Sequence, residues 1–132
     1  MSPSRVIALL LLSPAAACSA ADLSVYTDAS ANGFNPDCTW SDTVDFNQSA
    51  IVHAGAKAIR FTPAQYEGLS WCTPAGGIAT ANYRGLRFWV HGGANGGQNI
   101  KLAFATGNNG TELAHATVAQ LIGSPVPANT WV

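Results

Sequence analysis

Apolar and polar residues alternate along several short stretches of the chain, as in β-strands that bury one face. The clearest example is residues 85–91, which predict a strand with two different faces. Its apolar side chains share one face, and the other face carries the larger polar and aromatic ones: Arg87, Trp89 and His91. Because successive side chains of a strand point to opposite sides, we expect these three to form one outward row.

Other stretches also have the length and composition of strands, and Gly, Pro or Asn residues separate most of them. They are residues 23–27, 40–46, 56–62, 68–73, 99–106 and 111–120, with a further strand beginning at Trp131. The Ala-rich part of residues 111–120 is also compatible with a helix. No other segment after residue 21 has a helical period, so the pattern predicts an all-β fold, a β-sandwich at this chain length.

The first 21 residues differ from the rest and predict a secretory signal segment. Arg5 precedes an apolar run over residues 6–12, and small residues follow as far as Ala21. The run is too short to span a bilayer, so we expect a secreted protein whose residues 22–132 form one domain. Cys18 follows three alanines in a pattern that weakly resembles a lipobox, and a lipid anchor on Cys18 is the alternative.

Charge is scarce in this chain. Only 10% of the residues are charged, against about 25% in typical soluble proteins, and the formal net charge is −1. Hydroxyl and amide side chains supply the polarity instead. The few basic residues are scattered, which predicts neither a nucleic-acid surface nor binding to anionic membranes.

Two cysteines remain after the signal segment, Cys38 and Cys72. In an exported protein two cysteines favour a disulfide over two buried thiols, which is the alternative. Closing this loop would stabilise the fold by roughly 3–4 kcal/mol on the chain-entropy model. Two sequons, at Asn47 and Asn109, are acceptors for N-glycosylation if a eukaryotic cell makes the protein.

Several motifs follow one another in a familiar order: VYTD, CTWS, HAGAKAIRF, YRGLRFWV and NTWV. This order resembles secreted jelly-roll domains of the galactose-binding-like superfamily, the architecture of many carbohydrate-binding modules. The resemblance implies a jelly-roll sandwich and a polysaccharide or oligosaccharide partner. In that family two strands usually follow the late Trp, here Trp131, so we expect the domain to be incomplete at its C-terminus.

Saccharide recognition needs flat aromatic faces with polar groups around them. The outward row of residues 85–91 offers both, and a disulfide would bring two further tryptophans together. The candidate carbohydrate-binding residues are Arg87, Trp89, His91, Trp40, Trp71 and Gln98. The alternative places the tryptophans in the core, where tryptophan commonly packs against a disulfide in β-sandwiches.

Motifs for catalysis are missing from the sequence. It contains no Gly-x-Ser-x-Gly nucleophile elbow and no histidine pair at metal-binding spacing. The resemblance implies one candidate metal ligand, Asp28, for a structural calcium ion, and we expect no other cofactor. The sequence therefore favours a non-catalytic carbohydrate-binding module. The alternatives are a structural or adhesive β-sandwich without a glycan site, and the remnant or accessory part of a glycan-active enzyme.

Overall fold

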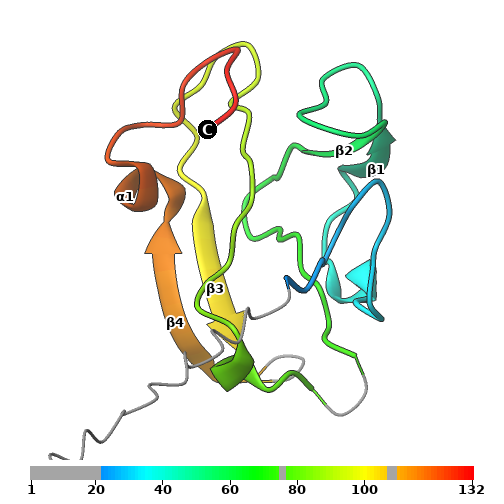
Figure 1. Cartoon of the computed structure of the whole chain (residues 1–132). Helices are drawn as coiled ribbons and strands as arrows, with labels where there is room; N and C mark the ends of the chain where they lie inside the picture. The colour runs from blue at the N-terminus through cyan, green and yellow to red at the C-terminus, as the bar shows by residue number, and fades with distance from the viewer. Residues whose placement is uncertain (1–21, 75–76, 107–109) are drawn as a thin grey trace, which may run out of the picture.

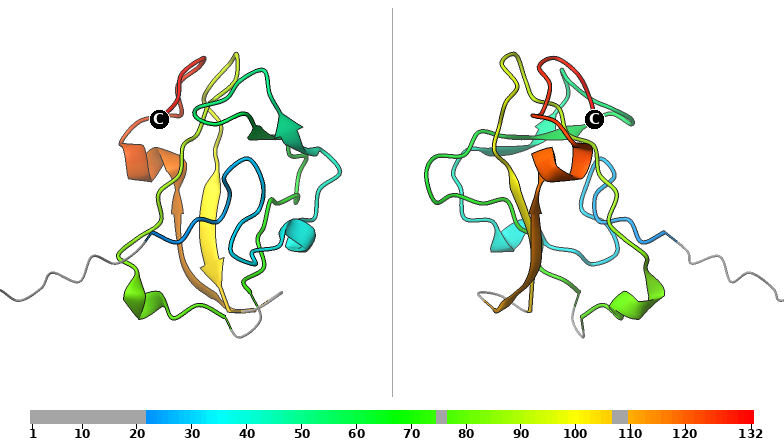
Figure 2. Two further views of the ribbon diagram at one scale, coloured as in Figure 1. Left: turned by 45° about the vertical axis from the view of Figure 1, so that its right-hand side comes forward. Right: turned by 90° about the vertical axis from the view of Figure 1, so that its left-hand side faces the viewer.

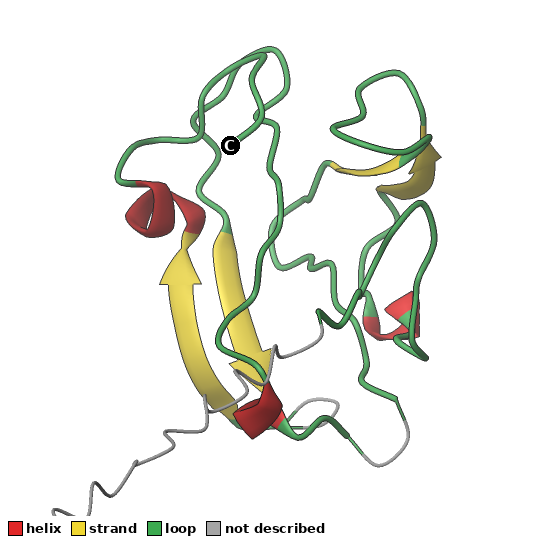
Figure 3. Ribbon diagram, viewed as in Figure 1, coloured by secondary structure: helices red, strands yellow, loops and turns green. Residues whose placement is uncertain are grey.

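A computed structural model describes residues 22–74, 77–106 and 110–132 (Figure 1). The predicted signal segment, with Cys18, lies outside the described residues, as does the sequon residue Asn109. Loops make up most of the described chain, and short strands and helices are set between them (Figure 3).

The strands of the described residues form two separate antiparallel pairs. Strand β1 (Val44–Gln48) pairs with β2 (Ala58–Phe61), and β3 (Lys101–Ala105) pairs with β4 (Glu112–Thr117). Figure 1 and Figure 2 show β3 and β4 lying side by side along their whole length. The predicted strands at 56–62 and 99–106 are therefore confirmed in shortened form, and that at 40–46 in part, shifted toward residue 48. The prediction of an all-β fold class is also confirmed, because the regular structure consists mainly of antiparallel strands.

Helices are few and short. Within the described ranges, two 3-10 turns, η1 (Pro36–Cys38) and η2 (Thr80–Asn82), lie in the loops, and one α-helix, α1 (Val118–Ile122), follows β4 directly. None of the helices in the described ranges is long and apolar enough to cross a membrane.

The sequence pattern at 111–120 predicts a strand, and a capping box explains why the strand ends early. The Thr117 hydroxyl accepts the backbone N–H of Gln120 at 3.2 Å, and the Gln120 side chain accepts the N–H of Thr117 at 2.8 Å. This reciprocal pair satisfies two backbone donors at a helix start. The helix then ends at Gly123, whose φ of 76° suits glycine. The Ala-rich part as far as Ala116 therefore lies in β4, and the helical alternative holds only for residues 118–120 of the segment.

The sequence pattern predicts a strand over residues 85–91, but the structure forms no regular strand there. Only the end of the segment pairs, through an isolated bridge between His91 and Trp131. Val90 and Val132 exchange two backbone hydrogen bonds, of 2.8 and 2.9 Å. Residues 85–89 make no backbone hydrogen bond to any other described residue. Alternation of side chains defines two faces, but a strand also needs a neighbour's backbone groups.

The segments predicted as strands at 23–27 and 68–73 likewise contribute only isolated bridges. Cys38 and Cys72 nevertheless form the predicted disulfide, with their Cα atoms 5.7 Å apart. Bridges between Asn35 and Cys72 and between Trp40 and Gly68 flank the bond on both sides. The disulfide therefore fixes η1 against residues 68–72.

Few apolar side chains are fully buried in the described part of the chain. Val118 at the start of α1 and Val126 in the C-terminal loop are the two with almost no exposure. Large aromatic side chains remain on the surface, among them Trp40 and Trp89. This leaves aromatic faces accessible to a ligand.

Candidate carbohydrate-binding site

Two histidines and two tryptophans from distant parts of the sequence form one group, called here the aromatic cluster: His53, Trp89, His91 and Trp131. The imidazole of His53 stacks on the indole of Trp89, with ring centroids 3.9 Å apart and planes 16° apart. His53 also meets Trp131 edge to face at 5.5 Å. His91 lies 5.2 Å from Trp131 on a tilted plane. The cluster is thus continuous from Trp89 to His91.

The backbone explains why Trp131 joins this cluster. It stands opposite His91 in an antiparallel bridge, and residues directly opposite each other in such a bridge present their side chains on the same face. Trp89 and His91 share that face because they are two residues apart in extended chain. Trp89 and His91 of the predicted outward row therefore lie together.

Trp89 is the more exposed of the two tryptophans in the cluster, with 53% of its surface accessible. His53 covers one face of the indole, so that face is closed to a ligand. A flat apolar face with a polar edge is the form of surface on which the C–H side of a sugar ring stacks.

Gln98 has a structural role in the neighbouring loop. Its amide nitrogen donates a hydrogen bond of 2.6 Å to the carbonyl of Gly92. The backbone N–H of Gly93 donates to Nδ1 of His91 at 3.1 Å, which orients that imidazole. The C-terminal loop holds the same turn, because Gly97 donates to the carbonyl of Val126 at 2.7 Å. The loop after His91 is therefore held in place by these three hydrogen bonds.

Arg87 lies outside the ring contacts of the cluster. Its side chain is exposed and lines a groove with Leu86, Phe88 and Val90, next to the helix α1. The structure thus brings together two members of the predicted row, Trp89 and His91, and places the third beside an apolar groove.

Trp71 belongs to a second aromatic group, with Tyr26 and Phe46. Its ring meets Tyr26 at 6.4 Å and Phe46 at 6.3 Å, both edge to face. Its indole N–H points to the hydroxyl of Ser30 at 3.4 Å. No ring contact among the described residues joins this group to the aromatic cluster, so Trp71 and Trp89 occupy different sites.

Trp40 stands apart from both groups. Its indole packs directly on Gly68, at a position where a Cβ atom would collide with the ring. Its Nε1 donates to the carbonyl of Tyr66 at 2.8 Å. Although Trp40 is 59% exposed, these contacts give it a role in holding the loop around residues 66–68.

Asp28, the predicted calcium ligand, has backbone partners in the structure. Its Oδ1 accepts the N–H groups of Ala56 at 2.9 Å and Lys57 at 2.8 Å. No group of three or more His, Cys, Asp or Glu side chains within the described ranges could hold a metal ion. The carboxylate thus has a structural role in joining two loops, and a calcium ion at Asp28 stays a prediction.

Comparison with known proteins adds no relative: no family model, no curated protein and no solved structure matches the chain. The site must therefore be assessed from its own geometry. The sequence reasoning missed His53: this residue begins the HAGAKAIRF motif, but nothing in the local pattern predicts its contact with Trp89. Trp131 could have been found, because pairing of its segment with residues 85–91 would place it beside His91.

Proposed function

We propose that this chain is a secreted, non-catalytic carbohydrate-binding module of the jelly-roll type. It binds polysaccharide by stacking a sugar ring on the open face of Trp89. The observation that carries the proposal is the half-exposed indole, which is supported from behind by the imidazole of His53.

The physical argument rests on rigidity and on mixed polarity. A side chain that is already fixed loses little conformational entropy when a ligand packs on it. The stack on His53 and the contact of His53 with Trp131 fix the indole of Trp89 before any ligand arrives. His91 lies beside Trp131, and because its Nδ1 accepts the N–H of Gly93, its Nε2 is left for sugar hydroxyl groups. The predicted export and the disulfide are consistent with an extracellular polysaccharide as the partner.

The test is a binding assay of the full chain, with its disulfide intact, on insoluble cellulose, chitin, xylan and mannan. Trp89→Ala should weaken binding to the recognised polysaccharide by about 30-fold, since removing an aromatic anchor costs on the order of 2 kcal/mol. Tyr66→Ala is the matched control, because Tyr66 is an exposed aromatic residue outside the cluster. It should bind as the unmodified chain does.

Two results would contradict the proposal. One is the absence of binding to every polysaccharide by the folded, unmodified chain, which is the expectation for a purely structural or adhesive sandwich. The other is real binding that Trp89→Ala leaves unchanged, which would move the site elsewhere on the surface.

A further inference from the structure

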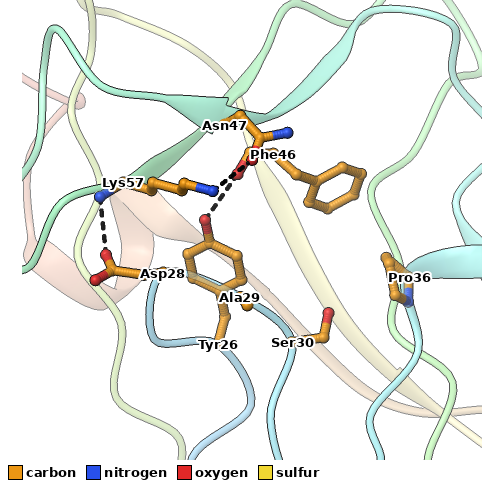
Figure 4. Close-up of a pocket in the computed structure, with 8 residues that line it drawn as sticks. All are labelled: Tyr26, Asp28, Ala29, Ser30, Pro36, Phe46, Asn47 and Lys57. Carbon is orange, nitrogen blue, oxygen red and sulfur yellow. Dashed lines mark hydrogen bonds between the residues drawn. The ribbon is translucent and has the colours of Figure 1, made fainter.

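A pocket of about 270 Å³ lies between the N-terminal loop and the β1–β2 pair (Figure 4). It shares no lining residue with the aromatic cluster. Aromatic and apolar side chains line one part, and polar side chains line another. The lining residues are Tyr26, Asp28, Ala29, Ser30, Pro36, Phe46, Asn47 and Lys57.

The aromatic part of the pocket is held in place. The Tyr26 hydroxyl donates to the carbonyl of Phe46 at 2.9 Å, which ties the N-terminal loop to β1. Burial and the nearby carboxylates of Asp28 and Asp45 raise the pKa of Tyr26, so the phenol keeps its proton and this bond. Trp71 packs edge to face against both rings from outside the pocket lining. The walls therefore exist before a ligand binds.

The polar part of the pocket contains hydrogen-bond donors and a hydrogen-bond acceptor. The Lys57 ammonium donates to Oδ1 of Asn47 at 2.8 Å, which leaves two of its three hydrogens for a ligand. The same bond leaves the amide NH₂ of Asn47 directed away from Lys57 (Figure 4). The carboxylate of Asp28 is bound through Oδ1 alone, so Oδ2 can accept hydrogen bonds. Ser30 adds a hydroxyl group that can donate or accept.

Charge and size restrict the class of ligand. Lys57 contributes one positive charge to the lining and Asp28 one negative charge, so their sum is near zero. Asp45 adds a further carboxylate close to Tyr26, which disfavours an anionic ligand. A volume of about 270 Å³ is just below the range of about 300–1,000 Å³ typical of sites for drug-sized molecules. A single six-membered ring with several hydroxyl groups fits these limits.

We propose that this pocket binds one neutral pyranose unit, with its C–H face against Tyr26 and Phe46. The ring hydroxyl groups bond to Lys57, Asn47 and Asp28. This is a second site, separate from the Trp89 surface, and it does not depend on polysaccharide binding there.

The test is a titration of the ¹⁵N-labelled full chain with the methyl glycosides of glucose, galactose, mannose and xylose, followed through the amide signals of residues 26–30, 47 and 57. At least one glycoside should produce saturable shifts, with a dissociation constant on the order of 1 mM. Ala29→Phe, which fills the pocket from an exposed position, should abolish them. Lys57→Met should weaken binding about 10-fold without removing any apolar wall.

Trp89→Ala is the control that separates the two sites, and it should leave these shifts unchanged. Loss of the shifts in Trp89→Ala would assign them to the aromatic cluster and overturn the pocket. The absence of saturable shifts with all four glycosides would overturn it too, as would shifts that persist in both pocket variants. Tighter binding of sodium glucuronate than of methyl glucoside would overturn the assignment to a neutral sugar. Binding to insoluble polysaccharide can succeed or fail independently of all these results.

Discussion

The imidazole of His53 and the indole of Trp89 lie almost parallel, 3.9 Å between centroids, although 36 positions separate them in the sequence. His53 comes from the loop between β1 and β2, whereas Trp89 comes from an extended segment that precedes β3. The contact therefore joins the two halves of the chain. It also decides which face of the indole is open.

His53→Ala should weaken polysaccharide binding about 3- to 10-fold, because Trp89 would lose the ring that fixes its orientation; stacked pairs contribute about 0.5–1.5 kcal/mol beyond burial. His53→Phe should restore most of the affinity, since it keeps a flat ring. The near-ultraviolet circular dichroism spectrum of the free protein should change in His53→Ala. In a chain that already carries Trp89→Ala, adding His53→Ala should change this spectrum much less. An equally large spectral change in that chain would show that His53 acts through another residue.

The disulfide should account for a large part of the stability. Replacing both Cys38 and Cys72 with Ala should lower the free energy of unfolding by about 3–4 kcal/mol, because the open chain regains loop entropy. Urea unfolding monitored by tryptophan fluorescence measures this difference. Reduction of the unmodified chain should have a similar effect and should leave the double variant unaffected. Equal stability of the oxidised and reduced chains would contradict the prediction.

Gly68→Ala should destabilise the protein by about 1–3 kcal/mol, the usual range for overpacking, because the new methyl group would overlap the indole of Trp40. Gly85→Ala is the control: a Cβ atom at Gly85 would meet no atom within 4 Å. Adding Trp40→Ala to Gly68→Ala should recover part of the loss, which a double-mutant cycle in urea would measure. A strictly additive cycle would exclude the clash as the cause.

Glu67 should make stability depend on pH in the acid range. The backbone N–H of Ala64, at 2.9 Å, and then the Ser41 hydroxyl, at 2.8 Å, donate to its carboxylate and lower its pKa. A folded-state pKa below the unfolded value of about 4.3 gives stability that is present above that value. This stability disappears as the pH falls through the lower folded value.

The melting temperature of the unmodified chain should therefore fall between pH 6 and pH 3, and that of Glu67→Gln should fall less over the same range. The two curves should converge at the acid end, where the carboxylate of Glu67 is protonated. Parallel curves would show that other groups govern the acid transition.

The sequence predicted the structure correctly where a pattern depends on local properties of the chain. Strands β2 and β3 follow from alternation and from the breaks that bound them. The pairing of Cys38 with Cys72 follows from the cysteine count together with the predicted export. The failure at residues 85–91 has a physical cause, since a period of two says nothing about which backbone will lie alongside. The end of β4 at Thr117 could have been predicted from the sequence, because Thr117 and Gln120 have the spacing of a capping box.

The candidate site was less accessible to sequence reasoning than the fold. Trp89 and His91 could be placed on one face from their spacing alone. The stack of His53 on Trp89 is a tertiary contact, and no local sequence signal around His53 predicts it. The separation of Trp71 from Trp89 likewise depends on how distant segments pack.

The hydrogen bond between Lys57 and Asn47 has a consequence for how the protein should be produced. It engages Oδ1 of Asn47, while Nδ2 is the atom to which an N-linked glycan is attached, and Asn47-Gln48-Ser49 is a sequon. A eukaryotic expression host that modified Asn47 would attach a covalent sugar to the lining of the pocket. A bacterial host without this machinery would leave Asn47 unmodified. The choice of host therefore decides whether the pocket is free to bind an added sugar or is already glycosylated at Asn47.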